Sequence, residues 1–117
     1  MQTWNQTAPI YQQLADRLAV QLLDGDPSEG EAMPSVRALA SRYLINPLTV
    51  SRAIQALSDM GLVETRRGMG IYVRPGARAA LLKSEREQFL QEEWPALRER
   101  LARLGISATD LNWESQQ

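Results

Sequence analysis

The chain has 117 residues, with 13 basic and 14 acidic side chains, a formal net charge of −1 and an apolar content of 44%. This length allows one domain, or one small domain with an appendage, and this composition is typical of a folded chain. The absence of cysteine and histidine excludes disulfides and removes the commonest zinc ligands and the commonest general base. No apolar run is long enough to span a membrane and the N-terminus has no signal-peptide pattern, so we expect a cytoplasmic protein without metal or cofactor.

Residues 1–7 are polar and predict a loose N-terminal segment. A helix is predicted from Pro9 to about Leu23, because apolar residues recur at every fourth position and form one core-facing stripe. This stripe consists of Ile10, Leu14, Leu18 and Leu22, with Tyr11 and Ala15 beside it. The segment 24–32 is acidic and contains glycine and proline, so we expect it to be a solvated connector.

The segment from Pro34 to Asp59 predicts two short helices joined by a tight turn. Asn46 is suited to cap the second helix, and Pro47 would occupy its first position, where a missing N–H costs nothing. Each helix has one apolar stripe, which consists of Val36, Leu39, Ala40 and Tyr43 in the first and of Val50, Ala53, Ile54 and Leu57 in the second.

The face of the second helix opposite its apolar stripe carries Leu48, Arg52 and Gln55, with Thr49 and Ser51 on the two shoulders. Small polar groups and an arginine near the exposed N-terminal end of the second helix are typical of a helix-turn-helix that binds DNA. An ordinary helical hairpin is the alternative.

The positive charge of the chain is concentrated in this region. Between Arg37 and Arg74 there are six arginines and two acidic residues, which give this stretch a local net charge of +4. Duplex DNA responds to such a local basic face more than to the overall charge. Ser35 can cap the first helix of the pair, and Arg37 opposes the dipole of that helix, so we expect a phosphate beside this helix end. A solvated surface arginine is the alternative.

A β-hairpin is predicted after Gly61, from two β-favouring runs, Leu62–Arg66 and Ile71–Val73, that flank the turn residues Gly68-Met69-Gly70. Arg66 and Arg67 are expected at its tip, against a phosphate backbone or in a minor groove. A lone G-x-G could also indicate a nucleotide-binding loop, but the third glycine and the following helix of that motif are missing. A helix-turn-helix followed by a basic hairpin is a winged helix.

Residues from about Pro9 to Pro75 resemble the DNA-binding domain of the GntR family of bacterial transcription regulators. The resemblance is carried by the segments PIYQQLADRL, MPSVRALA, NPLTVSRAIQALSDMGLV and RRGMGIYV. It implies DNA contacts from the start of the first helix of the pair, the N-terminal half of the second helix and the wing. The implied contact residues are Ser35, Arg37, Asn46, Thr49, Ser51, Arg52, Arg66, Arg67, Gly68 and Gly70.

Two residues depart from the family pattern. Leu48 stands where related sequences often carry asparagine, so any base contact there is expected to be apolar, for example with a thymine methyl group. Met33 replaces a usual leucine, which is a mild change in the core.

The residues after Pro75 change in character and predict a helix from Arg78 to Leu104, ended by Gly105. Pro95 predicts a kink or a break near Gln91–Trp94, because its ring clashes with the carbonyl four residues earlier. A short last helix is predicted from a Ser107 cap through Leu111 and Trp113, with Asp110 in the capping-box position. A heptad-like apolar seam runs along the long helix and consists of Leu82, Phe89, Leu90, Trp94, Leu97, Leu101 and Leu104.

This seam predicts self-association, because a strip of leucine and tryptophan has to be covered by something. A two-fold dimer would place two recognition helices roughly 34 Å apart and require a near-palindromic operator. The tail resembles the short C-terminal segment of the YtrA subfamily of GntR regulators, and this resemblance implies control of a nearby operon, in many cases one for a transporter. A small effector at the dimer interface, lined by Trp94, Arg98 and Trp113, stays open beside the alternative that these residues are interface core.

The sequence thus predicts a mainly α fold with a small β-hairpin, divided into a winged helix-turn-helix at 1–75 and a helical dimerisation tail at 76–117. The predicted function is a dimeric, sequence-specific repressor that binds double-stranded DNA. The alternative is a winged-helix module that binds protein without binding DNA. An enzyme is disfavoured, because without histidine or cysteine no ordinary nucleophile–base pair can be assembled.

Overall fold

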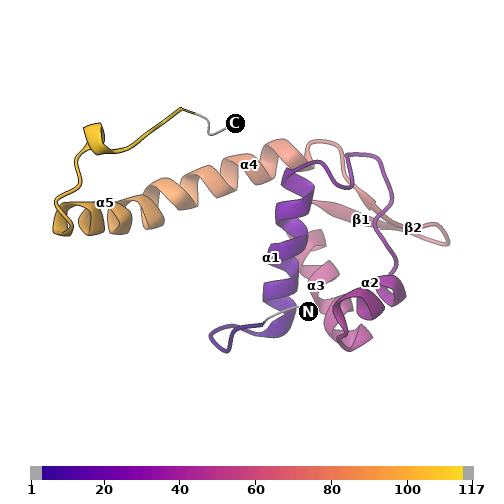
Figure 1. Cartoon of the computed structure of the whole chain (residues 1–117). Coiled ribbons are helices and arrows are strands. Elements are labelled where there is room, and N and C mark those ends of the chain that lie inside the picture. The colour runs from indigo at the N-terminus through magenta and orange to yellow at the C-terminus, as the bar shows by residue number, and fades with distance from the viewer. Residues whose placement is uncertain (1–3, 115–117) are drawn as a thin grey trace. The chain divides into compact units, whose positions relative to one another are not determined.

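The computed structural model describes residues 4–114 of a chain that divides into two units, Met1–Leu82 and Lys83–Gln117. The first unit begins with the helices α1 (Ile10–Leu23), α2 (Val36–Tyr43) and α3 (Pro47–Asp59) (Figure 1). They are followed by an antiparallel hairpin of β1 (Val63–Arg66) and β2 (Gly70–Val73). The mainly α fold with a small hairpin is therefore confirmed. None of the described helices is long and apolar enough to cross a membrane.

The core of the first unit is built from the predicted apolar stripes. In α1 the side chains of Leu14, Leu18 and Leu22 are buried, and α1 lies against α3. The stripe of α3 is buried along its whole length, and Leu39 and Tyr43 of α2 are buried with it. The first turns of α4 (Ala77–Gln88) add Ala77 and Leu81, each 2% exposed, to the same core. The assignment of DNA binding to 1–75 and dimerisation to 76–117 stays a prediction.

The N-terminal segment is more ordered than predicted over its described residues, while residues 1–3 lie outside the described part of the chain. The Nε2 atom of Gln13 donates to the carbonyls of Asn5 and Ala8, at 2.9 Å and 2.8 Å, and its Oε1 atom accepts from Asn5 N at 3.0 Å. The Trp4 ring packs against the core with its centroid 6.3 Å from that of Tyr43. One side-chain amide therefore supplies the backbone partners that this polar segment lacks.

The acidic segment 24–32 is not the freely solvated connector that the sequence predicts. Its end runs along β2, where Gly30 N donates to Val73 O at 2.8 Å and Val73 N donates to Glu31 O at 3.0 Å. Ala32 forms an isolated antiparallel bridge with Tyr72. The backbone of this segment thus satisfies the outer edge of the hairpin, which would otherwise be an unpaired strand edge.

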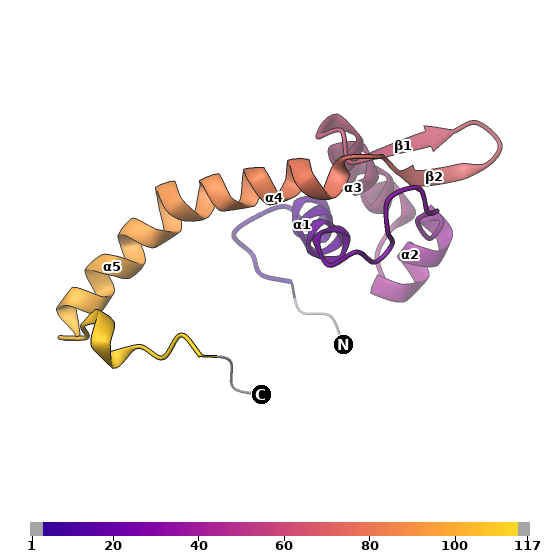
Figure 2. The same ribbon diagram turned by 90° about the horizontal axis from the view of Figure 1, so that it is seen from above.

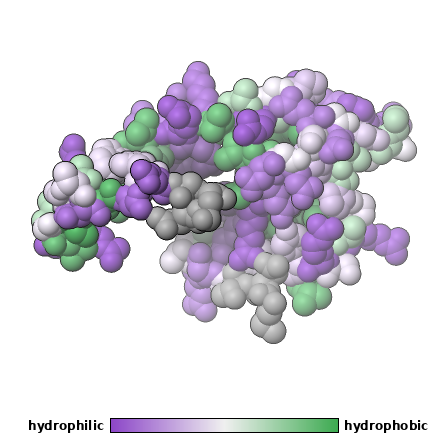
Figure 3. Space-filling view, turned by 45° about the horizontal axis from the view of Figure 1, so that its top comes forward, coloured by the Kyte–Doolittle hydropathy of each residue, from purple (hydrophilic) through white to green (hydrophobic). Residues whose placement is uncertain are grey.

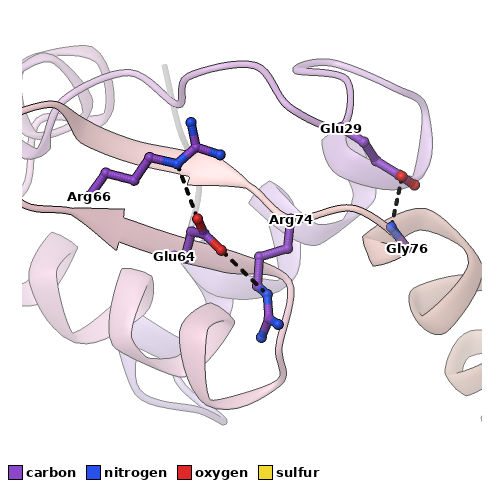
Figure 4. Close-up of polar contacts among 5 residues, drawn as sticks. All are labelled: Glu29, Glu64, Arg66, Arg74 and Gly76. Atoms are coloured by element: carbon purple, nitrogen blue, oxygen red, sulfur yellow. Dashed lines mark hydrogen bonds and ion pairs between the residues drawn. The ribbon is translucent and has the colours of Figure 1, made fainter.

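The carboxylate of Glu29 caps the start of α4 (Figure 4). Its Oε1 atom accepts from Gly76 N at 2.7 Å and its Oε2 atom accepts from Arg78 N at 3.2 Å. The Nε atom of Arg78 in turn donates to the carbonyl of Leu23 at 2.9 Å, at the end of α1. A carboxylate is favourable here, because the first N–H groups of a helix have no partner within the helix and carry a partial positive charge.

The turn between α2 and α3 contains Leu44 in the left-handed region, with φ 57° and ψ 48°. Ile45 N donates to Ala40 O at 3.1 Å, so the turn closes with the hydrogen bond of a Schellman motif. The Leu44 side chain is 83% exposed. Glycine or asparagine is usual in such a conformation, and nothing in the contacts of the described residues explains leucine here.

The helix of the tail is continuous from residue 77 to residue 103, and its axis bends part-way along (Figure 2). Residues Phe89–Glu93 form a π-helical turn, η1, and α5 follows at Trp94–Arg103. Trp94 N donates to Phe89 O, five residues earlier. The wider turn accommodates the proline, which has no N–H and whose ring would clash in a regular α-helix. The helix thus bends at a π-helical turn next to Gln91–Trp94, as the predicted kink requires, and it does not break.

The chain after Gly105 forms less helix than predicted. Gly105 has φ 71° and ends the helix, and Ser107 N donates to Asp110 Oδ2 at 2.8 Å as half of the predicted capping box. The helix that follows, η2, is only one 3₁₀ turn, Ala108–Asp110, because Leu111 is already extended with ψ 135°. The predicted extension through Trp113 is therefore wrong.

We predict that Glu29→Gln lowers the free energy of unfolding by about 1 kcal/mol, because a neutral amide replaces a charged cap at the positive end of α4. Urea unfolding monitored by tryptophan fluorescence measures this change. Glu87→Gln is the control, since it removes the same charge from the exposed surface of the same helix and is expected to shift stability by less than about 0.5 kcal/mol. Equal effects of the two substitutions would contradict the capping role.

Candidate nucleic-acid interface

Two of the predicted contact residues cap the helices of the helix-turn-helix. The Oγ atom of Ser35 accepts from Ala38 N at 3.1 Å and begins α2. The Oδ1 atom of Asn46 accepts from Leu48 N at 2.8 Å and begins α3. Both residues are exposed. The caps use their acceptor atoms, so the Ser35 hydroxyl hydrogen and the Asn46 Nδ2 group remain as donors that a phosphate could accept from.

The N-terminal half of α3 faces outward, as the sequence predicts. Leu48 is 74% exposed, Ser51 and Arg52 are exposed, and Thr49 is half-buried on the shoulder of the helix. In the first turn of α2, Arg37 is exposed as well. The outward direction follows from burial of the opposite face of α3, and the contact of these residues with DNA stays a prediction.

Arg52 does not extend freely from α3. Its guanidinium lies over the ring of Tyr11 in α1, with Cζ 4.2 Å from the ring centroid. A cation placed over an aromatic face at this distance is attracted by the ring quadrupole. The sequence gives no signal of this contact, because its pattern places Tyr11 beside the apolar stripe of the first helix and not next to Arg52. The contact limits the directions that Arg52 can adopt before any DNA is bound.

The wing has one buried face and one solvent face. Val63 and Val73 pair across the two strands and are each 2% exposed. Glu64 pairs with Tyr72 on the other face, and Arg66 follows Glu64 on that face, since side chains alternate along a strand. The turn closes with a hydrogen bond from Met69 N to Arg66 O at 2.8 Å. Its third residue, Gly68, has φ 76°, a conformation that this turn position requires and that glycine adopts without a steric cost.

Arg66 and Arg67 differ in their surroundings, although the sequence predicts both at the wing tip. Arg67 is exposed beyond the end of β1. Arg66 ends β1 and is half-buried, with Nε 3.1 Å from Glu64 Oε2 and Cζ 4.1 Å from the Tyr72 ring centroid. Glu64 also binds Arg74, with Oε1 3.6 Å from its Nε atom (Figure 4). Arg66 thus stands at the start of the tip turn, as predicted, but it is held there by Glu64 and Tyr72, two contacts for which the sequence gives no signal.

The predicted dimerisation residues are uncovered in the single chain. Figure 3 shows hydrophobic residues among hydrophilic ones on the part of the surface that α5 forms. Leu101 is half-buried, and the exposed fractions of the others are 39% for Leu82, 41% for Phe89, 56% for Leu90, 37% for Trp94, 42% for Leu97 and 60% for Leu104. Phe89 lines two shallow grooves, one with Leu90 and one with Leu97. Neither groove is lined by Trp94, Arg98 or Trp113, so the effector site stays a prediction.

Comparison with known proteins identifies the family. The model of the family described as bacterial regulatory proteins, gntR family, matches residues 10–73, which is more than half of the chain. The chain belongs to the GntR family. The matched residues run from the start of α1 to the end of β2, so the winged helix is that of a DNA-binding transcription regulator of this family.

Individual transcription regulators are similar over larger parts of the chain. The transcriptional repressor YtrA of Bacillus subtilis is 37% identical over 79 residues, which are 68% of this chain and 61% of YtrA. The chain therefore spans less than two thirds of the length of that relative. A GntR regulator from Bacteroides thetaiotaomicron is 35% identical, with a TM-score of 0.67 over 87% of this chain and 88% of that one. A regulator from Oenococcus oeni is 28% identical, with a TM-score of 0.73 over 93% and 89%.

We predict different effects for the two arginines that are held against tyrosine rings. Arg52→Ala is expected to relax base preference, with a loss of about 1–3 kcal/mol of discrimination at the base pair that it contacts. Arg66→Ala is expected to weaken binding to the operator and to its base-substituted forms alike and to reduce the slope of log K against log salt by about 1, because a phosphate contact is lost. Fluorescence anisotropy with operator and base-substituted duplexes at several salt concentrations separates the two. A loss of base preference in Arg66→Ala would contradict the assignment.

Proposed function

We propose that this GntR protein is a homodimeric repressor that blocks a promoter by binding a near-palindromic operator. The observation that carries the proposal is the outward N-terminal half of α3 beside a wing with three arginines. Side chains at the N-terminal end of a recognition helix reach base edges, and arginines of a wing reach phosphates. The proposed contact residues are those of α3 (Thr49, Ser51 and Arg52, with Leu48), the caps Ser35 and Asn46, Arg37, and Arg66, Arg67, Gly68 and Gly70 of the wing.

The dimer is proposed from the uncovered seam of the tail. Six of its seven apolar side chains are more than a third exposed, and apolar strips of this kind mark association surfaces. A heptad-like spacing on a helix favours packing against a second helix of the same kind. The π-helical turn at Phe89–Glu93 leaves Phe89 and Trp94 about one turn apart, so both aromatic rings can take part in one surface.

Repression and its target are proposed from the relatives. The similar protein YtrA is named as a repressor, and bound protein at a promoter blocks transcription without further machinery. We propose a nearby operon as the target, with a transporter operon as the first candidate, and the cytoplasm as the location, because the proposed partner is chromosomal DNA. A small effector that acts at the dimer interface remains an expectation.

Binding to DNA can be tested by a gel-shift titration with fragments of the promoter region of the gene that encodes the protein. We expect a shifted complex with an apparent Kd of about 10⁻⁸ M or lower for one fragment, and binding that is weaker by about 10³-fold or more to unrelated duplexes. Absence of a shift at low salt with any sequence would overturn DNA binding and favour a protein-interaction module.

The dimer can be tested by sedimentation velocity on the wild type and on Leu90→Glu/Leu97→Glu, which places charges in the seam. We expect a dimer for the wild type, and a folded monomer for the variant that has lost about 100-fold or more in operator affinity, because two linked half-sites no longer bind together. Val20→Glu, at an apolar position of α1 that is 57% exposed, is the control and is expected to stay dimeric. A wild-type monomer at micromolar concentrations would overturn the dimer.

A further inference from the structure

A single carboxylate lies among the arginines of the wing. One oxygen of Glu64, Oε2, is 3.1 Å from Arg66 Nε, and the other, Oε1, is 3.6 Å from Arg74 Nε (Figure 4). The Glu64 side chain is 42% exposed and projects from the solvent face of β1. Its position is unusual for a surface proposed to meet phosphates, because an acidic group there repels DNA.

Both ion pairs are made by the Nε atoms of the arginines. In Arg66 the guanidinium is also held against Tyr72, the residue that pairs with Glu64 across the hairpin. A guanidinium has five N–H donors in a planar arrangement, so an Nε contact with a carboxylate leaves the Nη groups able to bind a phosphate. Glu64 and Tyr72 together therefore restrict the orientation of Arg66 without occupying all of its donors.

Glu64 also changes the charge that the wing presents. Arg66, Arg67 and Arg74 carry three positive charges, and the carboxylate cancels one of them. Contacts with phosphate supply nearly all of the affinity for unrelated DNA, whereas base contacts add to the affinity for the operator only. A residue that lowers phosphate attraction therefore lowers binding to unrelated DNA. The ordered arginines bind best when the phosphates lie where the operator complex places them. Glu64 therefore lowers the affinity for the operator less than it lowers the affinity for unrelated DNA.

We propose that Glu64 is a positioning and specificity-determining residue of the wing. It orients Arg66 and Arg74 and cancels one positive charge, so that the affinity for DNA of any sequence is reduced relative to the affinity for the operator. This inference rests on the DNA-binding function proposed above and names a residue on which its selectivity depends.

The test compares the wild type with Glu64→Gln on two duplexes, the highest-affinity operator selected from a random pool and an unrelated sequence. For the unrelated duplex we expect the slope of log K against log salt to become steeper by about 0.9 and the affinity near 0.1 M salt to rise about 5- to 10-fold. For the operator we expect a rise of less than about 2-fold, since the loss of ordered arginines offsets the gain in charge. The ratio of operator to unrelated affinity thus falls about 3- to 10-fold.

Two further variants separate the effects of the charge and of the position of the Glu64 carboxylate from an effect on the folding of the wing. Glu99→Gln removes the same charge from α5 and is expected to leave the salt slope and the affinity ratio unchanged. Glu64→Asp keeps the charge but shortens the side chain, so the slope should stay at the wild-type value while part of the selectivity is lost. A thermal melt of each variant shows whether the wing remains folded.

Three results would overturn the inference. The first is an unchanged salt slope in Glu64→Gln, and the second is a weaker affinity for both duplexes, which is what a purely structural role predicts. The third is an equal gain for both duplexes, which would leave Glu64 without influence on selectivity. Wild-type protein that binds neither duplex at low salt would instead overturn the proposed function itself, and the inference with it.

Discussion

Burial of one face of α3 is the constraint on which the rest of the DNA-binding unit depends. Val50, Ala53 and Leu57 are 0% exposed and Ile54 is 6% exposed, against α1 and α2. Val50, Ile54 and Leu57 each contribute about 1.5–3 kcal/mol when their side chains are removed from water, so the rotation of α3 about its axis is fixed. The N-terminal half of α3 opposite this stripe can then face only outward, where Leu48 and Ser51 are exposed. The outward surface of α3, the proposed recognition surface, is therefore a consequence of core packing.

Arginines with aromatic partners recur across this unit. Arg17 lies over Trp4, Arg52 over Tyr11 and Arg66 over Tyr72, each with Cζ 4.1–4.2 Å from the ring centroid. A free arginine side chain has about 2 kcal/mol of rotamer entropy to lose when it is immobilised on a ligand. Stacking on a ring, and for Arg66 the additional pair with Glu64, removes part of that freedom in the unbound protein. In a protein that must select one site among many, such preorganisation favours the correct arrangement of phosphates and bases.

The acidic side chains of the unit serve its geometry as much as its solubility. Glu29 binds the first N–H groups of α4, and Glu64 connects two arginines of the wing. A net charge of −1 for the whole chain is thus compatible with a basic interaction surface, because these carboxylates are placed at helix ends and beside cations. The overall charge of a sequence carries little information about where a nucleic acid would bind.

The sequence by itself determined the helices, the hairpin and the outward face of α3, because these follow from local periodicity, caps and glycine turns. Asn46 and Pro47 begin α3, and Gly68 closes the wing turn, as predicted. Only the tertiary structure decided the contacts between residues that are distant in the chain. Three contacts depend on how the elements pack: Arg52 on Tyr11, segment 30–33 on β2, and Glu29 at the start of α4. No local sequence pattern shows that these residues come close in space. Likewise, Pro95 signals a disturbed helix, but whether it breaks or widens to a π turn depends on the hydrogen bonds that its neighbours can still make.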